Sequence, residues 1–159
     1  MRRTDRQVTD INEIKKILDE CYVCRVALLD KDMPYIIPLN YGYSEKEGKF
    51  EFYFHCAKEG KKLDLINENN NACFEIDGCH EFIEKEIDCQ CGMAYKSVVA
   101  KGKAYIINDE KEQMEALHAI IYRCRGGCDT YNVAEKQLES IVIFKIVADE
   151  ITAKQRINK

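Results

Sequence analysis

The chain has 159 residues, of which 46% are hydrophobic and 33% charged, and its formal net charge is −4. These values predict one folded domain over residues 1–159 and exclude a disordered chain. The negative charge, without a basic stripe, argues against nucleic acid as the main partner. No apolar run is long enough to span a membrane, and the N-terminal segment lacks the apolar stretch of a signal peptide. We therefore expect a cytoplasmic protein that binds neither nucleic acid nor membranes.

The cysteine count is high, at nine. Without a secretion signal, free thiols or metal ligands are expected rather than a disulfide framework. Cys21 and Cys24 form a CxxC motif, which lowers a thiol pKa in many redox proteins. A strand follows the motif directly, however, and no thioredoxin-like pattern surrounds it, so two structural thiols are the favoured interpretation.

A second group of potential ligands lies in the irregular stretch 77–92. Its spacing matches structural zinc sites poorly, so we predict no metal there and keep a zinc-stabilised interaction domain as an alternative. The residues concerned are Cys79, His80, Cys89 and Cys91.

The first predicted elements are a helix and a hairpin. Thr9 or Asp10 caps the helix, with Glu13 placed for a capping box. A strand over 25–29 and a turn at 30–34 lead into a second strand, Tyr35–Tyr43. This strand contains Pro38 and Gly42, which a central strand tolerates poorly, so we expect it to be bulged or at an edge, with its backbone exposed to a flat ligand.

The stretch 50–66 carries the strongest local signal. Phe50, Phe52 and Phe54 alternate with polar or amphipathic residues, as in a strand with one apolar face. A helix then begins near Gly60, Lys61 and Lys62. Free backbone N–H groups, a glycine and two lysines together favour a phosphate site, although a solvated lysine-rich turn is the alternative.

The later elements complete the pattern. They are a short strand over 72–76, a long strand over 93–108 with a bend at Gly102, and a helix that Asp109 caps and that runs to about Arg123. A helical turn is expected within 131–139, followed by a last strand over 140–147. Strands joined by short turns predict an antiparallel sheet that closes its edges.

Four segments resemble the pyridoxamine 5′-phosphate oxidase-like flavoproteins, and specifically their nitroimidazole-resistance branch. The pattern F-x-F-H-x-A-x-x-G-x-K over 52–62 is similar to the phosphate-binding junction of that family. The other segments are P-L-N-Y-G-Y (38–43), C-x5-Y-x-S-V (89–98) and the closing E-I-T-A-K (150–154), where Ala153 replaces the usual glycine.

The resemblance implies a mainly β (α+β) fold, an antiparallel split β-barrel of about six strands with flanking helices. It implies a homodimer that binds FMN, with FAD as the alternative, in grooves at the subunit interface. Gly60, Lys61 and Lys62 would hold the phosphate, and Tyr95 and Ser97 would approach the flavin from the partner subunit. The ring would lie along Pro38, Leu39, Asn40, Tyr41, Gly42 and Tyr43.

The activity that the resemblance implies is flavin-mediated hydride or electron transfer to a nitroaromatic or similar small substrate. His55 follows the three phenylalanines on the opposite face of the strand and is the candidate proton donor, since its ordinary pKa lies near neutrality. The alternative is that His55 only packs and orients the cofactor. A flavin- or haem-binding module without turnover is the alternative for the whole protein.

Overall fold

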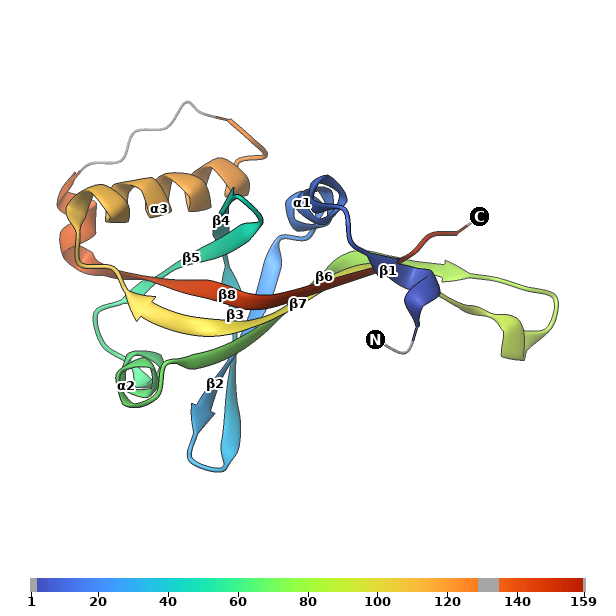
Figure 1. The fold of residues 1–159 in the computed structure, drawn as a ribbon, viewed down its shortest axis with the longest axis horizontal. Coiled ribbons are helices and arrows are strands. Elements are labelled where there is room, and N and C mark those ends of the chain that lie inside the picture. The colour runs from blue at the N-terminus through green and yellow to red at the C-terminus, as the bar shows by residue number, and fades with distance from the viewer. Residues whose placement is uncertain (1–2, 129–134, 159) are drawn as a thin grey trace.

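The computed structural model describes residues 3–128 and 135–158, which form one antiparallel sheet with three α-helices against it (Figure 1). The strand order is β3-β2-β6-β7-β8-β5-β4, and β1 pairs with β8. The strands are β1 (Gln7–Val8), β2 (Val23–Asp30), β3 (Met33–Asn40), β4 (Gly42–Lys46), β5 (Lys49–Ala57), β6 (Asn71–Ile83), β7 (Gly92–Ile106) and β8 (Ile141–Arg156). The helices are α1 (Ile11–Glu20), α2 (Lys61–Glu68) and α3 (Glu110–Cys124), with short 3-10 turns at Thr4–Arg6, Asp88–Gln90 and Glu135–Ser140.

The predicted antiparallel split barrel with flanking helices is confirmed, but the sheet has eight strands rather than about six. The stretch predicted as one strand over 35–43 is divided at Tyr41, whose side chain turns into the core. The turn that follows β4 is short, because β4 continues to Lys46 and β5 begins at Lys49. The stretch over 77–92, predicted to be irregular, is strand as far as Ile83, because β6 pairs with β7 again after a register shift between Gly78 and Glu81.

The local signals at element ends are confirmed by specific contacts. The Asp10 carboxylate accepts a hydrogen bond from the Glu13 backbone N–H at 3.0 Å and caps α1. Asp109 caps α3 in the same way through Glu112 N–H at 2.8 Å. The predicted irregularity at Gly102 is a register shift between β7 and β8, where a Cβ atom would lie 1.9 Å from a backbone carbonyl oxygen. The predicted helical turn over 131–139 lies partly outside the described residues.

The core occupies the inside of the barrel. Phe50, Phe52 and Phe54 are buried there together with the apolar residues of α1 and α2. Tyr53 points the other way, to a second cluster beneath α3. The two faces of β5 are therefore covered differently: the barrel core covers one, and α3 covers the other.

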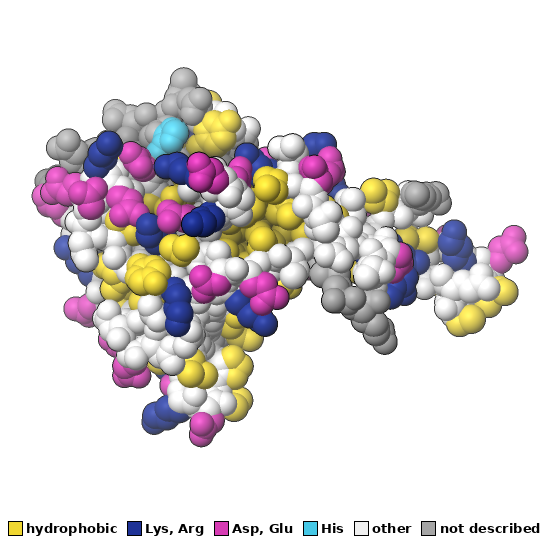
Figure 2. All heavy atoms as spheres, in the orientation of Figure 1, with side chains coloured by type: hydrophobic (Ala, Val, Ile, Leu, Met, Phe, Trp, Pro, Cys, Tyr) yellow, Lys and Arg dark blue, Asp and Glu magenta, His cyan; other side chains and the backbone are white. Residues whose placement is uncertain are grey.

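Helix α3 covers only part of the barrel exterior. It packs on β4, β5 and β8, whereas no helix of the described chain covers the exterior of β2 and β3 (Figure 1). Large apolar side chains are exposed on this uncovered part, with Ile36 at 60% exposure and Leu29 at 46%. The hairpin formed by the distal ends of β6 and β7 projects from the body, and Figure 2 shows hydrophobic side chains at its tip. The exposed apolar residues of this region include Phe82, Ile87 and Met93. Surfaces of this kind mark interaction sites.

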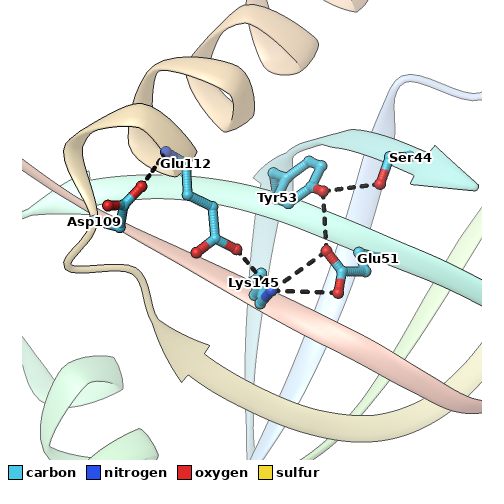
Figure 3. Close-up of polar contacts among 6 residues, drawn as sticks. All are labelled: Ser44, Glu51, Tyr53, Asp109, Glu112 and Lys145. Carbon is cyan, nitrogen blue, oxygen red and sulfur yellow. Dashed lines mark hydrogen bonds and ion pairs between the residues drawn. The ribbon is translucent and has the colours of Figure 1, made fainter.

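The N-terminal end of α3 is fixed by a lysine from the sheet. Lys145 of β8 contacts Glu112 of α3 at 2.6 Å and Glu51 of β5 at 3.2 Å (Figure 3). Glu51 also accepts a hydrogen bond from the Tyr53 hydroxyl, which contacts Ser44. Burial disfavours the charge of Lys145, but its hydrogen bonds to Glu112 and Glu51 outweigh this effect and raise the pKa of Lys145.

We predict that Lys145→Met lowers the free energy of unfolding by about 1–3 kcal/mol, because two half-buried carboxylates lose their partner. The folded-state pKa of Lys145 is raised, so its stabilisation is complete below the unfolded-state pKa of about 10.4 and is lost as the pH rises through the folded-state value. Denaturant unfolding at increasing pH should therefore show the difference between wild type and variant shrinking in the alkaline range. Lys111→Met, which removes an exposed lysine of α3, is the control. A difference that stays constant with pH would contradict the role of this charge.

Candidate functional site

The candidate site, called the groove below, is the region between two strand edges that the sheet leaves unpaired. β3 is the last strand at one end of the sheet. β4 pairs with β5 only as far as Tyr53, so the end of β5, from Phe54 to Ala57, has no strand on its β4 side in the described chain. Contacts described below connect β3 to both ends of the segment 55–62. Unpaired edges present backbone N–H and C=O groups, which suit a flat ligand with polar atoms on its rim.

Lys61 connects the start of α2 to one end of β3. Its ammonium group forms an ion pair with Asp30 at the end of β2 and lies 5.3 Å from the centre of the Tyr35 ring. The hydrogen bond to Asp30 raises the pKa of Lys61. The predicted phosphate lysine is thus already held by a carboxylate, a partner that the sequence alone did not indicate.

Gly60 and Lys62 frame a small space at the start of α2. Gly60 precedes the helix with φ +143°, a conformation that favours glycine. A Cβ atom on Gly60 would lie 3.9 Å from Lys62 Nζ, so this ammonium group reaches back over the helix start. The first N–H groups of a helix have no partner within the helix and carry partial positive charge. This arrangement fits a phosphate group.

His55 lies at the other end of the groove. It points away from the three phenylalanines, as predicted, and lines a cavity of about 360 Å³ beneath α3. The cavity walls include Ile121, Cys124 and Ile141. Asn40, at the end of β3, donates a hydrogen bond from Nδ2 to Cys124 Sγ at 3.7 Å. The predicted residues His55 and Asn40 therefore approach the same part of α3.

The two ends are far enough apart for an extended ligand. β3 runs from Tyr35, at the lysine end, to Asn40, at the histidine end. The five residue-to-residue steps from Tyr35 to Asn40 span roughly 17 Å at about 3.3 Å each. A ligand with a phosphate at one end and a ring at the other matches this layout.

The predicted ring-contact segment 38–43 is split between the groove and the interior. Pro38 and Asn40 are exposed on β3, and Leu39 is half-buried against the core. Tyr41 is 1% exposed, and its hydroxyl donates to the backbone carbonyls of Leu18 and Cys21. Contacts of Tyr41 with a ligand would therefore have to come from its backbone.

Gly42 and Tyr43 contact other parts of the protein. A Cβ atom on Gly42 would lie 2.5 Å from the backbone of Ala119 in α3, so only glycine fits there. Tyr43 donates a hydrogen bond from its hydroxyl to Asp19 of α1 at 2.8 Å. Burial, followed by this hydrogen bond, raises the pKa of Tyr43.

Tyr95 and Ser97 lie on β7, away from the groove. They alternate with Ala94 and Val98, which are buried, so they belong to the exterior of the barrel. The strand register aligns Pro38 with Arg25, Glu75 and Val99 across four strands. Val99 is the β7 member of this row of aligned residues, which begins at Pro38 on β3. Ser97 lies two residues before Val99 on the same face of β7. This position is compatible with the predicted contact to a partner's flavin, which stays a prediction.

A second, larger cleft was not predicted from the sequence. It has a volume of about 700 Å³ and lies between α1, β4 and α3. Arg123 of α3 lies at its wall and is only 7% exposed. Its guanidinium contacts the Cys21 carbonyl and the Tyr41 hydroxyl and lies 4.1 Å from the centre of the Tyr41 ring. The only sequence signal was a charged residue at the end of a helix with an apolar stripe.

The cysteine-rich stretch does not assemble into a ligand set. Within residues 3–128 and 135–158, no three His, Cys, Asp or Glu side chains are placed to hold a metal ion. His80 forms an ion pair with Asp77 at 2.8 Å, and Cys91 contacts the backbone of Lys85. Of the CxxC pair, Cys24 is completely buried in the core.

Comparison with known proteins agrees with this architecture. Residues 10–155 match the model of the family described as pyridoxamine 5′-phosphate oxidase. The chain belongs to this family. No curated protein matches it in sequence.

Among solved structures, a "putative 5-nitroimidazole antibiotic resistance protein" from Bacteroides thetaiotaomicron is similar, with 26% identity and a TM-score of 0.78 over 94% of this chain and 86% of that chain. The flavocytochrome Anf3 from Azotobacter vinelandii has 20% identity and a TM-score of 0.78 over 99% and 72% of the two chains. An FAD and haem binding protein from Mycobacterium smegmatis has 19% identity and a TM-score of 0.78 over 94% and 73%. The last two similarities establish the fold alone.

None of the helices in the described part of the chain has the length and apolar character needed to cross a membrane.

Proposed function

We propose that this protein binds FMN in the groove between β3 and the end of β5, and that it reduces nitroaromatic or similar small substrates. FAD is the alternative cofactor. The observation that carries the proposal is the pair of unpaired strand edges, with Gly60–Lys62 at one end and His55 at the other. Family membership supports a flavin, and the similarity to the Bacteroides thetaiotaomicron protein supports the nitroaromatic substrate class.

Each end of the groove has a separate task in this proposal. Gly60 and Lys62 hold the phosphate dianion, together with Lys61 once Asp30 is displaced from it. Backbone groups of Pro38, Leu39 and Asn40 bind the rim of the ring. When bound, the flavin supplies the hydride or electron transfer. The protein orients the ring, excludes water and moves protons.

His55 is the proton donor to the reducing substrate in this proposal. It is exposed and borders the apolar cavity beneath α3, where Ile121 and Cys124 form part of the wall. An apolar wall next to a titratable group suits a small aromatic substrate that must receive a proton.

The first test separates the phosphate from the ring. Lys61→Ala with Lys62→Ala should weaken FMN much more than riboflavin, because only FMN carries the phosphate. Each charge-assisted hydrogen bond lost costs about 1.5–3 kcal/mol, so we expect at least a tenfold difference between the ligands in a binding titration. Lys58→Ala, which changes an exposed lysine in the same turn, is the control. Equal losses for both ligands would remove the lysines from the site.

The ion pair seen at Lys61 gives a further expectation in the same titration. Asp30→Asn removes the carboxylate that competes with the phosphate for Lys61. The variant should therefore bind FMN more tightly than wild type and bind riboflavin unchanged. Weaker FMN binding would mean that Asp30 positions Lys61 rather than competing for it.

The second test concerns catalysis. His55→Gln should keep FMN bound and slow the reduction of a nitroaromatic by the prereduced protein, on the order of 10²-fold, if general acid catalysis is lost. His118→Gln changes a histidine that lines the other cleft and should leave the rate unchanged. A parental rate for His55→Gln across pH would show that His55 is not the proton donor. Loss of FMN from this variant would show that its role is to hold the cofactor.

The third test concerns association. The uncovered exterior of β2, β3, β6 and β7 exposes Val99 beside Ser97, and we propose that a second copy covers it and completes the flavin groove. Light scattering should give a dimer, and Val99→Lys should weaken both dimerisation and FMN binding, because a buried lysine lacks a partner. Tyr122→Lys, at similar exposure on α3, is the control. A flavin-loaded monomer would contradict the proposal.

A further inference from the structure

Two thiols far apart in the sequence lie near each other, where α1 ends and where the pairing of β6 with β7 shifts in register. Cys21 directly follows α1 and is 2% exposed. Cys79 is exposed and lies where the register between β6 and β7 shifts, between Gly78 and Glu81. Its φ of +54° is in the left-handed region, which is unusual for a cysteine. This backbone conformation accompanies a side chain that faces α1.

Contacts on both sides bring the two sulfurs together. Cys79 Sγ donates a hydrogen bond to Glu20 Oε2 at 3.3 Å, and Glu20 is the neighbour of Cys21. Cys21 Sγ lies against the backbone of Gly78, the neighbour of Cys79, so closely that a Cβ atom on Gly78 would be 2.9 Å away. The pair 20–21 therefore faces the pair 78–79.

The surrounding charges fit a site of proton transfer. Glu20 forms an ion pair with Lys96 of β7, so a cation lies beside the carboxylate that Cys79 contacts. Burial raises the pKa of Cys21 to about 12. Burial and the hydrogen bond to Glu20 also raise the pKa of Cys79. The hydrogen bond from Lys96 lowers the pKa of Glu20, so this carboxylate is ionised beside the Cys79 thiol. It is the adjacent group that can take the Cys79 proton as the sulfur attacks an oxidant.

We propose that Cys79 and Cys21 form a peroxide-reactive thiol pair, in which exposed Cys79 attacks the oxidant and buried Cys21 closes a disulfide between α1 and β6. The CxxC partner Cys24 is not part of this pair, because it is fully buried in the barrel core. The proposal does not depend on flavin binding, since none of its residues lies in the groove.

The chemistry balances with hydrogen peroxide as the oxidant. Cys79 sulfur attacks one peroxide oxygen, the O–O bond breaks, and the thiol proton passes through Glu20 to the leaving hydroxide, which gives water and a sulfenic acid. Cys21 sulfur then attacks Cys79 sulfur and displaces the hydroxyl group, which leaves as a second water with the Cys21 proton. Two thiols are oxidised to one disulfide, and one peroxide is reduced to two waters.

The test is to treat the folded protein with stoichiometric hydrogen peroxide, block the remaining thiols and map the cysteines by mass spectrometry. We expect one linked peptide pair joining Cys21 to Cys79, at the expense of both free thiols. Linkage of Cys79 to Cys89 or Cys91 instead, or no linkage involving Cys21, would overturn the proposal.

Two variants separate the roles of the thiols. Cys21→Ala should leave Cys79 as a sulfenic acid that dimedone traps, whereas wild type should trap little, because Cys21 consumes the intermediate. Glu20→Gln should slow disulfide formation several-fold without changing the residues linked, and Glu81→Gln, on the same β6 hairpin, is its control. Equal trapping by dimedone in wild type and Cys21→Ala would exclude Cys21 as the resolving thiol. The wild-type map remains decisive if a variant fails to fold.

Discussion

The buried guanidinium of Arg123 is the contact on which the rest of the structure depends. It lies at the C-terminal end of α3 and meets the carbonyls at the C-terminal end of α1, which carry partial negative charge. It also lies over the face of Tyr41, the residue between β3 and β4. Among the described residues, its Nε has no hydrogen-bond partner. Carbonyls at a helix end and an aromatic face hold the guanidinium, and three distant segments are fixed to one point.

This junction decides where the groove lies. Because Tyr41 is held in the core, the chain changes direction there, and β4 pairs with only the first part of β5. The end of β5 and the edge of β3 are then each left with only one neighbouring strand in the described chain. Lys145 fixes the N-terminal end of α3 on the sheet, and Arg123 fixes its C-terminal end. The helix that covers the His55 cavity is therefore held at both ends. On the α3 side, the candidate site is fixed by contacts of Arg123 and Lys145, which lie outside the site.

Much of the fold was predictable because its signals are local. The alternation of Phe50, Phe52 and Phe54 specifies a strand face, and Asp10 and Asp109 specify helix starts. For the site, the positions of His55 and Gly60–Lys62 followed from the same stretch. The break at Tyr41 could not be predicted, because it depends on Arg123, 82 residues further along the chain. The ion pair of Lys61 with Asp30 and the approach of Cys21 to Cys79 are likewise long-range contacts, and periodicity within a segment carries no information about them.

The contact between Gly42 and α3 has a consequence for the size of the cavity beneath α3. At this position the backbone of β4 lies directly against the backbone of Ala119, so the spacing between helix and sheet is set by main-chain atoms rather than by side chains. The distance between α3 and the strand that carries His55 therefore depends little on the side chains that line the cavity. Relatives could change the shape of the cavity by altering Ile121 or Cys124. A deeper cavity requires α3 to move away from the sheet, and any side chain at position 42 would force that movement.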